Sequence, residues 1–232
     1  MYSKRGTDVL LRAKPMQELM NQSVGRFQTL DTESGEIMAK YLYIEGNPKQ
    51  YRFDAKEGVF SIHYDENNIE KVGSSLSFQP MAWRIFTDDI LGLGLKTWAE
   101  LFFIDETGCV SEVLFHGYSV ANLERLIQPL YYNRVKLNEV VLTVNADKKE
   151  NTKITPKGVY FIASFTYKLA DKVQTEEFND FAETVLLYRR DTLTEKAQVR
   201  VIKNMFNPFI DATGEHEQAA CLQEPVEETV AA

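Results

Sequence analysis

Alternating apolar and polar positions predict a series of β-strands through the middle of the chain. Residues 97–104 and 109–116 have apolar side chains at strand spacing, and the connection 105–108 ends in Gly108. A short connection with glycine at a position of positive φ is typical of a β-hairpin. Pro80 lacks a backbone donor, so we expect a bend or a sheet edge there. Earlier strands are predicted at 41–44, 50–53, 58–64 and 76–86.

The apolar spacing changes to that of a helix after the second hairpin strand. Residues 119–128 are predicted to form this helix, with Ser119 as its N-cap and Pro129 as its end. The side facing the core is predicted to consist of Val120, Leu123, Leu126 and Ile127.

Two further strand-like segments, 139–144 and 159–168, enclose a predicted loop at 145–158 that contains four lysines. A strand pair, one helix and then a hairpin with a long basic loop is typical of the later part of an OB-type barrel. The predicted fold class is mostly β with α additions (α+β). We expect an OB-like antiparallel barrel with N-terminal β elaboration and C-terminal helices, from about Thr175 and from Thr192 or Thr194 to Phe206.

Charge and composition divide the chain into three parts. Residues 1–40 are mixed and locally basic, residues 41–210 form the β-rich domain with its C-terminal helices, and residues 211–232 form an acidic tail. The tail has six acidic residues and no lysine or arginine; the rest has 26 basic and 28 acidic residues, a net charge of −2 compared with −8 for the whole chain. The composition predicts a disordered interaction tail.

The sequence has no recognisable catalytic motif. Nucleophile-elbow, zinc-protease, phosphate-loop and dinucleotide-binding patterns are absent, and the three histidines are scattered. Cys109 and Cys221 occur in unrelated settings, which favours neither a disulfide framework nor a metal site. We therefore expect a protein without enzymatic activity, cofactor or metal.

No apolar segment reaches the roughly 18 residues of a membrane span, and no secretory signal is recognisable, so the expected location is the cytoplasm.

Aromatic residues interleaved with cations give the sequence its clearest functional indication. A protein that binds single strands without sequence preference needs aromatic rings for base stacking and cations for the phosphates. Trp98 and Tyr160 are the candidate stacking residues, although a role in the core is about equally consistent with their positions. Phe102 and most other strand aromatics are expected in the core. The candidate phosphate contacts are Arg52, Arg84, Lys96, Lys148, Lys149, Lys153 and Lys157. The lysines at 148–157 are equally compatible with a solvated hairpin tip.

In the order of its elements and in its acidic tail, the chain resembles single-stranded-DNA-binding proteins of phages and mobile elements. The resemblance implies a barrel that coats unpaired strands during replication, recombination or repair. It also implies a tail that recruits replication or repair proteins and competes with DNA for the groove. This tail ends at Glu227–Ala232 without the aspartate-rich stretch and terminal Pro-Phe of the bacterial pattern.

A second function class remains open at this stage. A virion or assembly protein would use the same β-rich body and its aromatic residues for protein–protein contacts. A nucleic-acid-processing enzyme would need clustered carboxylates, which the sequence does not place together. The preference between DNA and RNA, a homo-oligomeric state and a phage or host origin are not determined by the sequence.

Overall fold

The computed structural model describes residues 25–31, 33–65, 67–152, 158–192 and 198–200. The chain divides into two compact units, Met1–Tyr41 and Leu42–Ala232. In the first unit, β1 (Gln28–Leu30) and β2 (Ile37–Ala39) form an antiparallel hairpin that the sequence pattern did not predict. The acidic tail lies outside the described residues.

A seven-stranded mixed sheet forms the larger layer of the second unit, in the order β12-β7-β8-β9-β3-β4-β5. All neighbours are antiparallel except β3 and β9, which run parallel. The strands are β3 (Lys49–Asp54), β4 (Val59–His63), β5 (Ile69–Gly73), β7 (Pro80–Asp88), β8 (Lys96–Ile104), β9 (Val110–His116) and β12 (Gln198–Arg200). The β8–β9 hairpin is confirmed, with Gly108 at φ 76°.

A three-stranded antiparallel sheet, in the order β11-β10-β6, forms the smaller layer. Its strands are β6 (Ser75–Phe78), β10 (Val140–Asn151) and β11 (Gly158–Leu169). Only Gln79 separates β6 from β7, so the chain passes from one sheet to the other at the predicted bend before Pro80. Because β10 pairs with β6, the last hairpin belongs to a different sheet from β8 and β9.

The main core lies on one face of the seven-stranded sheet. Leu101 and Phe103 of β8 and Val113 of β9 are buried there with Leu142 and Val144 of β10. β8 is buried on both faces, since Trp98, Glu100 and Phe102 point to the other side and are also buried. The large sheet is therefore covered on both faces in its centre.

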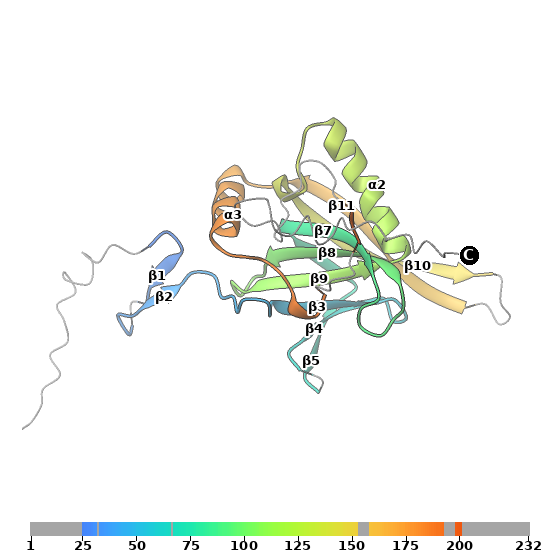
Figure 1. The fold of residues 1–232 in the computed structure, drawn as a ribbon, viewed down its shortest axis with the longest axis horizontal. Coiled ribbons are helices and arrows are strands. Elements are labelled where there is room, and N and C mark those ends of the chain that lie inside the picture. The colour runs from blue at the N-terminus through green and yellow to red at the C-terminus, as the bar shows by residue number, and fades with distance from the viewer. Residues whose placement is uncertain (1–24, 32, 66, 153–157, 193–197, 201–232) are drawn as a thin grey trace, which may run out of the picture. The chain divides into compact units, whose positions relative to one another are not determined.

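Helix α2 (Tyr118–Tyr132) packs against β11, as Figure 1 shows. Val120, Leu123 and Ile127 are buried as predicted. Two details differ from the prediction. Gly117, not Ser119, is the N-cap residue, and Ser119 Oγ instead accepts a hydrogen bond from the Ala163 backbone N–H at 2.9 Å. Pro129 lies inside the helix on an exposed face, where water can solvate the carbonyl that its missing N–H leaves unbonded.

The chain after β11 is less helical than the sequence predicts. Helix α3 (Lys172–Thr184) has Asp171 as its N-cap, whose side chain accepts a hydrogen bond from Gln174 N–H, and it ends before Val185. The 3-10 helices are η1 (Leu137–Glu139) and η2 (Arg190–Thr192). Within the predicted helix from Thr192 or Thr194 to Phe206, residues 198–200 form strand β12 because they pair with β7. The remainder of that prediction lies mostly outside the described residues.

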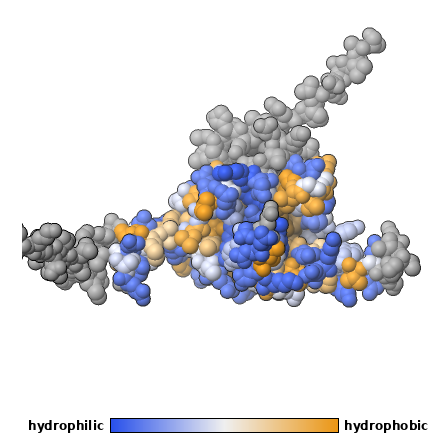
Figure 2. Space-filling view, turned by 90° about the horizontal axis from the view of Figure 1, so that it is seen from below, coloured by the Kyte–Doolittle hydropathy of each residue, from blue (hydrophilic) through white to orange (hydrophobic). Residues whose placement is uncertain are grey.

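The observed fold is mostly β with α additions, as predicted, but the two sheets of the second unit are open in the described part of the chain. An OB-like closed barrel is therefore not confirmed. None of the described helices is long and apolar enough to cross a membrane. Figure 2 shows a face that is mainly hydrophilic, with apolar residues in separate patches.

Candidate nucleic-acid interface

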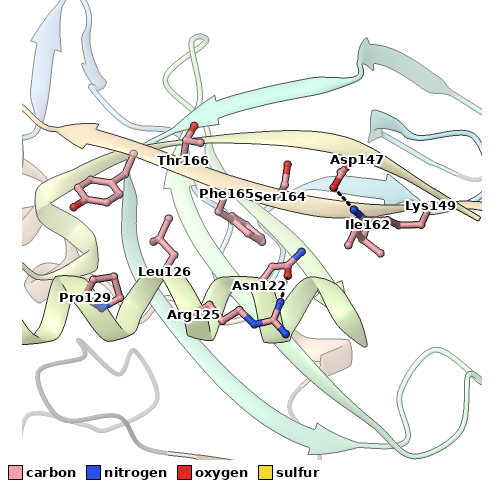
Figure 3. Close-up of a pocket in the computed structure, with 11 residues that line it drawn as sticks. Asn122, Arg125, Leu126, Pro129, Asp147, Lys149, Ile162, Ser164, Phe165 and Thr166 are labelled. Atoms are coloured by element: carbon pink, nitrogen blue, oxygen red, sulfur yellow. Dashed lines mark hydrogen bonds and ion pairs between the residues drawn. The ribbon is translucent and has the colours of Figure 1, made fainter.

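A groove of about 710 Å³ runs between α2 and the β10–β11 hairpin. Figure 3 shows Asn122, Arg125, Leu126 and Pro129 of α2 along one side, opposite residues of the two strands. The strand residues of this α2–β11 groove are Asp147, Lys149, Ile162, Ser164, Phe165, Thr166 and Tyr167. The groove thus combines two cations, one carboxylate, aromatic rings and hydroxyl groups.

Lys149 and Tyr160, both predicted as contacts, lie directly opposite each other on β10 and β11. Directly opposed residues of antiparallel strands project from the same face, so the ammonium group of Lys149, which lines the groove, and the ring of Tyr160 lie on one face of the hairpin. Lys149 Nζ forms an ion pair with Asp147 at 2.7 Å, and both side chains are close to half exposed. An exposed pair of this kind is weak, so a phosphate can replace Asp147 as the partner of Lys149.

The free edge of β11 is fixed by α2 at the centre of the groove. Asn122 Nδ2 donates to the Ala163 carbonyl at 2.8 Å, and Ser119 Oγ accepts from Ala163 N–H at 2.9 Å. Arg125 Nη1 donates to Asn122 Oδ1 at 3.0 Å, which holds the guanidinium beside the strand. These contacts give hydrogen-bond partners to the backbone N–H and carbonyl of Ala163 on the strand edge, and they position Arg125 along the groove.

The predicted lysine loop is largely strand. β10 continues to Asn151 and β11 begins at Gly158, because the residues of 145–151 pair in register with those of 158–164. Lys148 is exposed but projects from the opposite face to Lys149, since neighbouring strand residues alternate. Lys153 and Lys157 lie outside the described residues.

Arg52 and Lys96 are separated from the α2–β11 groove because they belong to the seven-stranded sheet. Arg52 is exposed on β3, where its Nη2 donates to Gln50 Oε1 at 3.3 Å. Burial, with smaller contributions from the charges of Arg52 and Arg189, lowers the pKa of His63. Lys96 is half-buried at the start of β8. The structure therefore does not bring these two cations to the groove.

The prediction that Trp98 stacks on bases is wrong, because the side chain is only 2% exposed. It packs with Phe86 and Ile90, and its Nε1–H donates to the Asp88 carbonyl at 3.1 Å. The ring is thus a core residue on the second buried face of the sheet.

The prediction that Arg84 contacts phosphate is also wrong. Arg84 Nε donates to Glu100 Oε2 at 2.6 Å, and Arg84 Nη2 donates to the Thr192 carbonyl at 2.8 Å. Nearby, Arg189 Nη1 donates to Glu112 Oε2 at 3.1 Å and the same guanidinium holds Asp191 through two hydrogen bonds of 2.6 and 2.7 Å. This buried ion-pair network joins η2 to the face of the sheet opposite the main core, so its cations are unavailable to a ligand.

The buried network predicts a dependence of stability on pH. Its two guanidinium groups face three carboxyl groups, those of Glu100, Glu112 and Asp191. Burial raises the pKa of Glu112 to about 8, against the attraction of Arg189 and with a contribution from the charge of Glu100. Glu112 Oε1 has no hydrogen-bond partner among the described residues, which favours the neutral carboxyl.

Between the ordinary pKa of 4.5 and about 8, the folded protein holds a proton on Glu112 that the unfolded chain releases. The free energy of unfolding should therefore fall as pH rises through this range. Glu112→Gln keeps a neutral side chain and should reduce this slope, measured by urea denaturation at pH 5.5 and 8.5. An unchanged slope in the variant would assign the pH dependence to other groups.

Sequence reasoning missed Asn122, Arg125 and Tyr167 as groove residues. The helical spacing of Asn122, Arg125 and Pro129 was visible as the polar side of α2. However, no local pattern showed that this side lies along the free edge of β11. Among the residues that the structure describes, no cluster of histidine, cysteine and carboxylate groups could hold a metal ion.

Comparison of the chain with family models, with curated proteins and with solved structures finds no match. The functional assignment therefore rests on the chemistry of the groove itself.

Proposed function

We propose that this protein binds single-stranded DNA, without sequence preference and without catalysis, along the α2–β11 groove. The observation that carries the proposal is the pairing of Lys149, which lines the groove, with Tyr160 beside it on the same face of the hairpin. Arg125 and the 43% exposed ring of Tyr167, which projects from the other face of β11, give the groove lining a second cation and an aromatic ring. A single strand offers a π-face at every base and a charge at every phosphate, which this combination matches. An OB-like fold would be compatible with this groove, although binding of a single strand along the groove does not require a closed barrel.

The direct test is fluorescence anisotropy of a labelled oligo-dT with the full-length protein at 20 to 300 mM salt. Both tryptophans are buried, so a label on the oligonucleotide is a better reporter than intrinsic fluorescence. Binding should weaken as salt rises, because phosphate contacts release counterions. Failure of the full chain and of a chain ending at Ile210 to bind at low salt would refute the proposal. Parallel titrations with oligo-U and duplex DNA measure the preference for DNA over RNA and for single strands.

The acidic tail is expected to compete with DNA for the basic residues of the domain. Six carboxylates on a tether of about 20 residues would have a high effective concentration near a groove on the same molecule. Removing residues 211–232 should therefore tighten oligo-dT binding at low salt, and the gain should shrink as salt screens the charges. Equal affinities of the two chains at 20 mM salt would contradict this role. A tail that also recruits replication or repair proteins would remain accessible in the DNA-bound form.

Exposed leucines favour a second candidate function, that of a virion or assembly protein. Leu91, Leu93 and Leu95 lie between β7 and β8, and each is at least 46% exposed. Exposed apolar side chains of this kind are common in protein–protein contacts. Light scattering coupled to size-exclusion chromatography distinguishes the two candidates. A large, salt-resistant homo-oligomer that does not bind oligonucleotides would favour assembly.

A further inference from the structure

The end of α2 carries a surface patch of two tyrosines and two cations. This tyrosine–arginine patch consists of Tyr131, Tyr132, Arg134 and Lys136, all of them exposed. The rings of Tyr131 and Tyr132 lie 5.8 Å apart at an interplanar angle of 73°, and Tyr132 is 74% exposed. Tyr131 is 44% exposed, so the ring of Tyr132 in particular contributes little to the core and packing does not explain its position.

Tyr132 of the patch continues the helical stripe that lines the α2–β11 groove. Asn122, Arg125, Leu126 and Pro129 recur at spacings of three and four residues, which places them on one side of the helix. The next step of three residues after Pro129 reaches Tyr132. Figure 3 shows Pro129 far along α2 from Asn122, near the side of the groove formed by Thr166. A ligand lying along the groove therefore reaches the patch at this end.

Arg134 occupies a backbone position that normally favours glycine. Its φ is 58°, in the left-handed region. Arg134 N–H donates to the Tyr131 carbonyl at 3.0 Å and Val135 N–H donates to the Leu130 carbonyl at 2.9 Å. These two bonds form a Schellman motif, in which the residue at the position of Arg134 is usually glycine. The sequence thus holds an exposed cation where the fold alone would favour no side chain.

We propose that the tyrosine–arginine patch is a second contact surface for single-stranded DNA, which receives the strand where it leaves the α2–β11 groove. The patch offers rings for stacking and two cations for phosphates, the same chemistry as the groove. Glu139 is the neighbouring carboxylate, and its Oε2 accepts a hydrogen bond from the backbone N–H of Lys136. This inference rests on the function proposed above and adds an exit path to it.

Because the groove has a limited length, short and long oligonucleotides can distinguish binding to the α2–β11 groove from binding to the tyrosine–arginine patch. The segment of β11 from Tyr160 to Tyr167 spans about 23 Å at the usual rise of a strand, roughly 3.3 Å per residue. At the roughly 3.4 Å per nucleotide of one strand in B-form DNA, about seven nucleotides fill this length, and a more extended single strand fills it with fewer. A six-nucleotide ligand can occupy the groove alone, whereas a twelve-nucleotide ligand reaches the patch.

The experiment compares labelled (dT)6 and (dT)12 binding to the full chain and to Arg134→Gly and Tyr132→Ala variants. Tyr132→Ala should weaken (dT)12 binding by about five-fold to a hundred-fold, the range of one stacking contact, and leave (dT)6 binding unchanged. Arg134→Gly should weaken (dT)12 binding while it raises Tm by about 2–4 °C, because glycine relieves the left-handed backbone. Lower affinity in a more stable protein cannot result from misfolding.

Arg190→Ala is the matched control, since it removes one exposed arginine from η2, on another face of the domain. It should affect (dT)6 and (dT)12 equally and only slightly. Unchanged (dT)12 affinity in both patch variants, or an equal loss for both lengths, would overturn the inference. If the unaltered protein binds neither oligonucleotide, the proposed function itself fails.

Discussion

Replacing Arg84 with alanine is expected to lower the free energy of unfolding by about 3–5 kcal/mol. Arg84 and Glu100 are 1% and 0% exposed, and the substitution would leave the Glu100 carboxylate buried without its ion-pair partner. It would also remove the donor to the Thr192 carbonyl, which holds η2 against the sheet. Because a domain is usually stabilised by only about 5–15 kcal/mol, urea denaturation should show a large decrease of the midpoint.

Two comparisons separate the buried pair from ordinary surface charge. Arg84→Met combined with Glu100→Leu removes both charges and should cost less than Arg84→Ala alone. Lys71→Ala breaks the Lys71–Glu57 pair, whose side chains are 70% and 58% exposed, and should cost at most about 1 kcal/mol. Equal costs for Arg84→Ala and Lys71→Ala would show that the buried network contributes little to stability.

Replacing Tyr160 with alanine should reduce oligo-dT affinity by an amount corresponding to about 1–3 kcal/mol, the contribution of one stacked base. Lys149→Ala should weaken binding and also flatten its salt dependence, with a change of about 0.7 in the slope of log affinity against log salt. Both residues are on the outer face of β10–β11, so neither change should disturb the core. Anisotropy titrations of labelled oligo-dT at several salt concentrations measure both effects.

Two neighbouring residues provide control variants, one expected to tighten oligo-dT binding and one expected to change it little. Asp147→Asn should tighten binding, because it removes the carboxylate that pairs with Lys149. Lys148→Ala should change affinity less than Lys149→Ala, since Lys148 projects from the other face of the same strand. If the two lysine variants lose affinity equally, the DNA does not follow the α2–β11 groove.

Local patterns in the sequence were sufficient to predict part of the secondary structure, including the β8–β9 hairpin and helix α2. The alternation in 97–104 and 109–116 and the glycine at 108 specify a hairpin, because strand alternation and turn geometry depend on neighbouring residues alone. Helix α2 follows from the spacing of Val120, Leu123 and Ile127 for the same reason. The class of fold was predicted from the sequence in this way, and so were the phosphate contact proposed for Lys149 and the base stacking proposed for Tyr160.

Only the tertiary structure decided which predicted cations and aromatics are exposed. Arg84 lies on the sheet face opposite the main core, where the segment around Thr192 buries it through a contact that spans about a hundred residues of sequence. Trp98 lies on the same face and packs with Phe86 and Ile90. The register of β10 with β11 separated Lys149 from Lys148, since strand neighbours point to opposite faces. The pairing of β10 with β6, instead of with β8 or β9, produced open sheets in place of a barrel. Burial, register and sheet partners depend on contacts between distant segments, and composition and spacing along the chain do not specify them.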